Sequence, residues 1–196
     1  RAAPKGAGPV PAAPIPRPPE RAIAAAIGRA AERVHRLPLF FERTETGRVG
    51  LAELPELLPD RALLSVAQGP GGALGVVAIG PGLLASVIEM QAIGRVSARP
   101  APDRRPTRTD GALCVDFVNA CLSELAAELV GYEEFAGIAG YGHASHVEDP
   151  RPLGLLLEDQ PYLFIQIHLR AGDAGQRDSV LMLALPAPAQ SVPRSL

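Results

Sequence analysis

The sequence contains no tryptophan, and its aromatic residues amount to 4% of 196 positions. Aliphatic side chains must therefore fill any core, and a hydrophobic share of 47% is enough for one domain. An excess of positive charge is also missing, because 19 Lys and Arg stand against 21 Asp and Glu. Nucleic-acid-binding proteins normally carry a basic surplus, so this balance argues against a nucleic-acid partner.

Cysteine is scarce as well, with Cys114 and Cys121 as the two examples. They are separated by two turns of a predicted helix, roughly 10 Å, which is too far for a disulfide bond within that helix. We expect both to be small buried hydrophobic residues in a reducing compartment, with a thiol nucleophile as the alternative. No apolar signal peptide is visible, and because the first residue is Arg1 we expect the natural N-terminus to lie upstream.

One long stretch without charge, Ala62 to Ile88, is interrupted by glycine and proline. Gly-Pro-Gly-Gly at 69–72 and Gly-Pro-Gly at 80–82 divide it into pieces of roughly seven to eight residues, whereas a membrane-spanning helix needs about 20. We therefore expect no direct membrane insertion. The pattern favours two strands joined by a turn, followed by a helix that ends at Gly94.

Proline and glycine, with 21 and 20 residues, gather at the chain ends and at turns. Seven prolines within residues 1–19 predict a disordered Ala/Pro-rich tail. Residues 187–196 form a second, C-terminal tail of similar composition. The folded domain is therefore expected at 20–186.

Apolar periodicity within that domain switches between helical and strand spacing. A Thr107 cap with Asp110 three residues later marks the start of the longest helix, which Gly131 is expected to close. The expected helices lie at 20–36, 83–92 and 108–130, with a short helical turn or strand start at 153–157. The expected strands lie at 37–46, 62–68, 73–79, 138–147, 162–169 and 179–185. Helix plus hairpin thus occurs twice, which predicts an α/β domain with a mixed sheet flanked by long helices.

Familiar catalytic motifs are missing. The turn at 69–72 lacks the Gly-Lys-Ser/Thr of a phosphate-binding loop, and no Gly-x-Ser-x-Gly elbow occurs. His143 and His146 form the one close histidine pair, but in a strand a spacing of three sends side chains to opposite faces. Glu148 and Asp149 nearby keep a metal site open as an alternative, although tight sites usually need three or four convergent ligands. We therefore expect no metal and no other cofactor.

The order of elements and several local strings resemble the middle domain of the flagellar motor switch protein FliM, which has the CheC-like fold that chemotaxis phosphatases share. The resemblance covers about residues 20–186. The strings that carry it are Ser65–Ile79 followed by Leu83–Glu89, then Pro106–Asp110, His146–Ile167, and Ser179–Pro186 with its closing Leu181-Met182-Leu183-Ala184-Leu185-Pro186. The resemblance implies a CheC-like fold with two helix-plus-hairpin halves.

The function that the resemblance implies is that of a non-enzymatic structural component of the bacterial flagellar motor switch, the C-ring. Such a protein is cytoplasmic and peripheral to the inner membrane at the flagellar basal body. It packs against copies of itself and other switch proteins and sets the direction of rotation in motility and chemotaxis. The family's N-terminal segment, which binds a phosphorylated response regulator, and its C-terminal ring domain have no counterpart in this sequence.

The family contacts a neighbouring switch protein through a Gly-Gly-x-Gly loop, of which Gly94 alone matches here. Arg95 beside it and the basic loop that follows are therefore the candidate partner contacts, with an ordinary solvated loop as the alternative. The candidate site residues are Gly94, Arg95, Arg99, Arg104 and Arg105.

CheC-type phosphatases offer an enzymatic alternative on the same fold. They place a Glu and, three residues later, an Asn on a helix, where one side chain positions the attacking water. Asp116 and Asn119 come near to this pattern, but the carboxylate is one methylene shorter and Ala112 stands at the upstream position. Glu89 on the preceding helix is followed by Ala92. We therefore expect no enzyme, and keep a response-regulator phosphatase and a stand-alone binding module of the same fold as alternatives.

Overall fold

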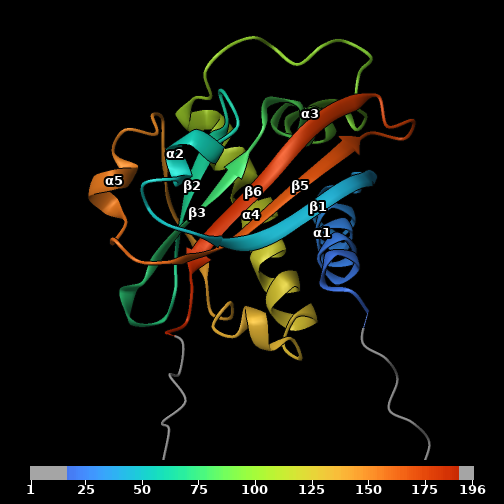
Figure 1. Cartoon of the computed structure of the whole chain (residues 1–196). Helices are drawn as coiled ribbons and strands as arrows, with labels where there is room; N and C mark the ends of the chain where they lie inside the picture. The colour runs from blue at the N-terminus through green and yellow to red at the C-terminus, as the bar shows by residue number, and fades with distance from the viewer. Residues whose placement is uncertain (1–16, 190–196) are drawn as a thin grey trace, which may run out of the picture.

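The computed structural model describes residues 17–189, which fold around one six-stranded sheet (Figure 1). The α-helices are α1 (Pro19–His35), α2 (Leu54–Leu57), α3 (Pro81–Ile93), α4 (Arg108–Glu128) and α5 (Leu153–Leu156), with 3-10 turns η1 (Pro70–Gly72) and η2 (Glu133–Phe135). The strands are β1 (Leu39–Val49), β2 (Leu63–Gln68), β3 (Leu74–Ile79), β4 (Gly142–Val147), β5 (Tyr162–Ala171) and β6 (Arg177–Pro186).

The sheet joins two similar halves of the chain, α1-β1-α2-β2-β3-α3 and α4-β4-α5-β5-β6. The strand order is β1-β5-β6-β3-β2-β4, so the hairpins β2–β3 and β5–β6 meet at the centre and each is flanked by the single strand of the other half. The sequence predicts a mixed sheet, but every pairing is antiparallel, because both hairpins and their flanking strands alternate in direction. The pairings β1–β5, β3–β6 and β2–β4 therefore bind the two halves into one folding unit.

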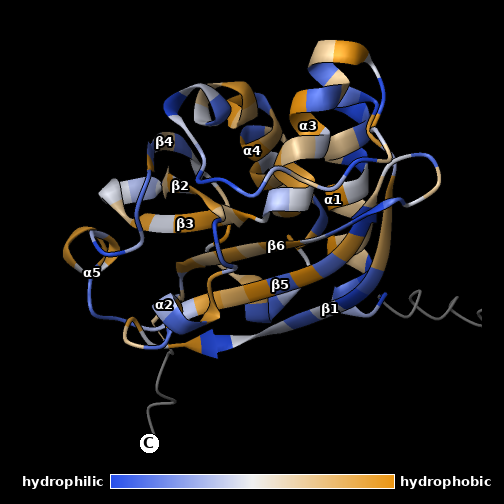
Figure 2. Cartoon of the chain, turned by 90° about the horizontal axis from the view of Figure 1, so that it is seen from above, coloured by the Kyte–Doolittle hydropathy of each residue, from blue (hydrophilic) through white to orange (hydrophobic). Residues whose placement is uncertain are grey.

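Helices cover the two faces of the sheet unequally. The long helices α1, α3 and α4 pack on one face over an aliphatic core, and the short α2 and α5 lie over part of the other (Figure 1). Apolar residues gather on the central strands, whereas the loops and the outer strand β1 are more polar (Figure 2). Tyr162 and Phe117 are the largest of the fully buried side chains. The other large side chains that are fully buried are aliphatic, as the low aromatic content predicts.

Two predicted element boundaries are wrong. β4 begins at Gly142 and not at residue 138, because Gly137 and Gly140 adopt φ of 91° and 85°, which a strand cannot contain. α4 ends at Glu128 with Leu129 as its cap, so Gly131 does not close the helix. The remaining predicted helices and strands are confirmed to within a few residues, and 153–157 forms a helical turn.

Residues 1–16 of the predicted N-terminal tail and residues 190–196 of the predicted C-terminal tail lie outside the described residues. Among residues 17–189, no helix combines the length and the apolar character that crossing a membrane requires.

Candidate protein-interaction site

The predicted partner contacts lie in one exposed segment, residues 94–107, which we call the strap. The strap leaves α3 at Gly94, whose left-handed conformation (φ 71°) lets its N–H donate to Met90 O at 3.1 Å. It then passes over the top of the molecule to the start of α4 and contains no helix or strand (Figure 1). Four arginines and one aspartate make it strongly basic in a chain whose net charge is −2.

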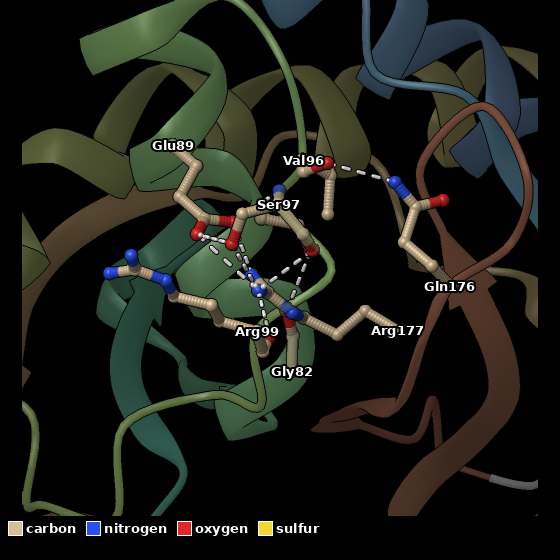
Figure 3. A network of polar contacts seen from close by, with 8 residues as sticks. Gly82, Glu89, Val96, Ser97, Arg99, Gln176 and Arg177 are labelled. Atoms are coloured by element: carbon tan, nitrogen blue, oxygen red, sulfur yellow. Dashed lines mark hydrogen bonds and ion pairs between the residues drawn. The ribbon is translucent and has the colours of Figure 1, made fainter.

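The first half of the strap is held by a partly buried ion pair (Figure 3). Arg177, at the start of β6, is 5% exposed and donates to the carboxylate of Glu89 on α3. The same guanidinium donates to Ser97 O at 3.2 Å and to Arg99 O at 2.6 Å. Ser97 Oγ in turn donates to Glu89 Oε1 at 2.6 Å. One guanidinium thus connects α3, β6 and the strap backbone.

The ionisation of Glu89 reflects this arrangement. Burial alone would raise the pKa of its carboxyl group, but hydrogen bonds from Arg177 and Ser97 outweigh burial and hold the pKa below its usual value. Glu89 is therefore charged near neutral pH, as the ion pair with Arg177 requires.

The second half of the strap is held at the N-terminus of α4. Arg104 donates to both carboxylate oxygens of Asp110, at 2.6 and 3.1 Å. Asp110 also accepts from Thr107 N at 2.7 Å, which completes the predicted capping box with Thr107. The Arg104 guanidinium and the Thr107 hydrogen bonds outweigh burial and lower the pKa of Asp110. A further ion pair joins Asp103 to Arg61.

These contacts separate the four strap arginines into two kinds. Arg104 is engaged with Asp110, whereas Arg95, Arg99 and Arg105 are exposed and form no ion pair with any residue from 17 to 189. Sequence reasoning missed two exposed apolar side chains on the helices that the strap connects, one at the end of α3 and one in α4. Ile93 is 56% exposed and Leu113 is 36% exposed. The site therefore combines free positive charge with exposed apolar surface, a combination that suits a protein partner.

A hollow of about 340 Å³ adjoins the Gly94 turn. Its lining includes His35, Met90, Gly94 and Asp173, which come from α1, α3, the strap and the β5–β6 turn. A partner side chain that enters beside Gly94 would therefore touch both halves of the molecule.

Two of the alternative catalytic residues, Glu89 and Asn119, form hydrogen bonds that hold the fold together, whereas Asp116 is exposed. Glu89 is held by Arg177, so it is not free to position a water molecule. Asp116 and Asn119 line a shallow groove of about 420 Å³ that also contains Arg33. The side-chain oxygen of Asn119 accepts from the backbone N–H of His143 at 2.8 Å, which ties it to the edge strand β4.

Both cysteines are buried, as predicted. Burial raises the pKa of Cys114 to about 12 and raises that of Cys121 further. Neither sulfur therefore forms the thiolate that a nucleophile requires at neutral pH.

The prediction that His143 and His146 lie on opposite faces of a strand is wrong. A β-bulge between Val66 and Ala67 of β2 shifts the register of β4, so that His143 pairs with Ala67 and His146 with Ser65. Because the extra residue changes the alternation, both imidazoles face α4. His143 Nδ1 lies 2.6 Å from Ser65 Oγ, and the His146 ring packs against Gly111. Within residues 17–189, no three His, Cys, Asp or Glu side chains gather as a metal site would require.

We expect His143 and His35 to make stability depend on pH. Burial, with the nearby His146 adding to it, lowers the pKa of His143 below 6.5, and burial likewise lowers that of His35. The unfolded chain therefore binds protons that the folded chain does not. The contribution of these two groups to the free energy of unfolding is fully present above pH 6.5 and is lost as pH falls below it. Urea unfolding at a series of pH values from about 7 to about 5 should show this loss, and His143→Gln should make it shallower. An unchanged slope in that variant would contradict the assignment.

Comparison with known proteins gives a consistent result for the fold. No protein-family model matches the sequence, and no curated protein does either. Among solved structures, a chain of the FliG–FliM complex from H. pylori is similar, with a TM-score of 0.62 and 11% identity over 85% of this chain and 86% of that chain. The FliM middle domain from Vibrio alginolyticus has a TM-score of 0.59 and 10% identity over 86% and 94%. Thermotoga maritima FliY has a TM-score of 0.53 and 10% identity over 85% and 89%.

The fold is therefore that of the domains from which flagellar switch proteins are built. More particularly, the chain has the fold of the FliM middle domain, and the predicted CheC-like architecture with its two helix-plus-hairpin halves is confirmed. At about 10% identity these likenesses establish the fold and leave partners and activity to be argued from the site.

Sequence reasoning placed the strap correctly but missed what holds it. Glu89 is the single charge in α3, and Arg177 follows the glycine-rich turn before the last strand. A lone charge inside an apolar helix is a signal that a partner of opposite sign lies nearby, because a buried charge is otherwise unfavourable. The sequence does not indicate which of its many arginines that partner is.

Proposed function

We propose that this protein is a non-enzymatic structural component of the bacterial flagellar motor switch. In this role it packs against copies of itself and other switch proteins, on the cytoplasmic side of the inner membrane, and contributes to setting the direction of rotation. The observation that carries the proposal is the similarity to a chain of the FliG–FliM complex over 85% of this chain. A role as a rigid scaffold also suits a domain whose halves share three strand pairings.

We assign the partner-binding role to the strap, with Gly94, Arg95, Arg99 and Arg105 as direct contacts. Three guanidinium groups that form no ion pair within residues 17–189 favour an acidic partner surface, because opposite charge steers association and fixes orientation. The exposed apolar side chains supply the burial that charge alone does not. Arg104 contributes by fixing the strap to Asp110.

A charge-reversal variant tests this assignment. Arg95→Glu, Arg99→Glu and Arg105→Glu together should weaken binding to the host's purified FliG at least tenfold, about 1.4 kcal/mol, and should reduce its dependence on salt. Because none of the three forms an ion pair within residues 17–189, the free energy of unfolding should stay nearly unchanged. Isothermal titration calorimetry at two salt concentrations measures the first effect and urea unfolding measures the second.

Arg48→Glu is the matched control, because Arg48 is an exposed arginine on the outer strand β1. Its substitution reverses one exposed charge where the strap variant reverses three, and it should leave FliG affinity intact. Equal binding by the charge-reversal variant and the unaltered protein would rule out the strap as the contact. Normal swimming of a strain without the gene would count against the switch role itself.

A response-regulator phosphatase is the second candidate function. One observation favours it, namely that Asp116 and Asn119 stand three residues apart in an exposed groove with Arg33. Dephosphorylation of the host's aspartyl-phosphate response regulator, lost in Asp116→Ala and Asn119→Ala, would establish it. Absence of turnover would leave the structural role, and copurification without any flagellar protein would favour a stand-alone binding module.

A further inference from the structure

Arg177 is an unusual residue for the place it occupies. Its side chain is 5% exposed, and a buried guanidinium is tolerated where a carboxylate and further acceptors satisfy it. Here the carboxylate of Glu89 supplies the charge, while Ser97 O, Ser97 Oγ and Arg99 O supply the acceptors. Two of the acceptors are backbone carbonyl oxygens of the strap. The buried guanidinium of Arg177 thus binds the strap backbone as well as Glu89 of α3.

The strap depends on such side-chain contacts for its order. Within the described part of the chain, the backbone hydrogen bond from Arg104 N to Pro102 O is the one that begins and ends inside the strap. Gln176, next to Arg177, adds a hydrogen bond from its side chain to Val96 O at 2.9 Å. Residues 96–99 are therefore attached to the β5–β6 hairpin by two neighbouring side chains (Figure 3).

The backbone and the side chain of Arg99 face different surroundings. Its carbonyl oxygen is bound by Arg177, whereas its side chain is exposed and points away from Arg177 (Figure 3). The inner contact therefore determines where the outer guanidinium is presented. A strap without that contact would sample many conformations, and a partner would have to select one of them.

We propose that Arg177 and Glu89 are positioning residues that hold the strap in its partner-binding conformation. This inference rests on the proposed function, and it adds that affinity at the strap is controlled by two residues that do not touch the partner. Loss of the pair frees residues 96–99, and binding then has to order them again. The contacts that order the strap in the unbound protein thus strengthen binding, because residues 96–99 do not have to be ordered when the partner binds.

Hydrogen exchange in the unbound protein tests the ordering step without any partner. Among residues 96–99, the Ser97 amide donates to Glu89 Oε2 at 3.4 Å, so in Arg177→Met this amide should exchange at least tenfold faster than in the unaltered protein, while the amides of β3 and β5 should keep their protection. Arg177→Lys keeps one cation but not the planar fork of donors, so it should give intermediate protection. Ser97→Ala, a milder change within the same contacts, serves if Arg177→Met fails to fold.

Binding to purified FliG from the host tests the consequence. Arg177→Met should weaken binding about tenfold, and adding Glu89→Gln should weaken it little further, because the two residues act as one unit. Arg177→Lys should restore part of the affinity.

The outcomes separate this inference from the function beneath it. Faster exchange with unchanged FliG affinity would overturn the positioning role, and the proposed function would stand if charge reversal at Arg95, Arg99 and Arg105 still weakened binding. Unchanged exchange at residues 96–99 would overturn the inference directly. Failure of the unaltered protein to bind FliG would overturn the inference together with the function on which it rests.

Discussion

Phe117→Ala is expected to lower the free energy of unfolding by about 3–5 kcal/mol, the usual effect of removing a fully buried phenylalanine. Phe117 is 0% exposed, and it projects from the middle of α4 into the core that α1, α3 and the sheet enclose. Its ring centroid lies 6.4 Å from that of His35 at the end of α1. Because Phe117 is fully buried in a closely packed core, its removal leaves a cavity that the neighbouring side chains fill only in part. Chemical denaturation measured by circular dichroism would give the value.

Leu113 provides the matched control on the same helix, one turn earlier. It is 36% exposed, so Leu113→Ala removes less buried apolar surface and should cost about 1 kcal/mol or less. Similar losses in the two variants would mean that α4 does not pack as described. The comparison uses one helix and one type of truncation, so differences in helix propensity contribute little.

The elements of this fold could be predicted because their signals are local. A proline pair at the start of α1, the Thr107–Asp110 capping box at the start of α4 and the glycine-rich turns between paired strands each act over a few residues. All the groups that form such a feature lie within a few positions of one another in the sequence. The predicted boundaries therefore failed mainly between α4 and β4, where Gly137 and Gly140 turn the chain without a strong apolar pattern on either side.

The register of the sheet could not be predicted in the same way. Whether His143 and His146 share a face depends on a bulge that appears where β4 meets β2, and these strands are separated by more than seventy residues. The bulge changes the alternation of β4 without any mark in its own sequence. Only the pairing partner reveals it.

For the strap, too, the local features could be predicted from the sequence, whereas a contact between distant residues could not. Basic residues after Gly94 indicated an exposed loop, and that loop is where they lie. The anchoring of the strap by Arg177 joins residues 88 positions apart in the sequence, Glu89 and Arg177. Their pairing follows from the meeting of the two hairpins at the centre of the sheet, since α3 follows one hairpin and Arg177 begins the last strand of the other. Topology, and not composition, thus places the residues that anchor the strap.

Gly82→Val is expected to destabilise the protein by about 3 kcal/mol, at the upper end of the usual range for overpacking. Gly82 lies in the first turn of α3, and a Cβ at this position would overlap the carbonyl oxygen of Asp178 on β6. That oxygen belongs to the backbone of a paired strand, so α3 has to move away. Gly131→Ala is the control, because Gly131 has open space around it and no positive φ, and this change should be neutral or slightly stabilising.

Gly82→Val should also loosen the strap, because Glu89 lies two turns further along the same helix. A shift of α3 relative to β6 moves the Glu89 carboxylate away from Arg177, and faster hydrogen exchange at residues 96–99 would follow. Destabilisation without faster exchange at the strap would mean that α3 adjusts at its N-terminus alone. Faster exchange there, with Gly131→Ala unchanged, would show that the close approach of α3 to β6 keeps the Glu89–Arg177 ion pair in place and, through it, the conformation of the strap.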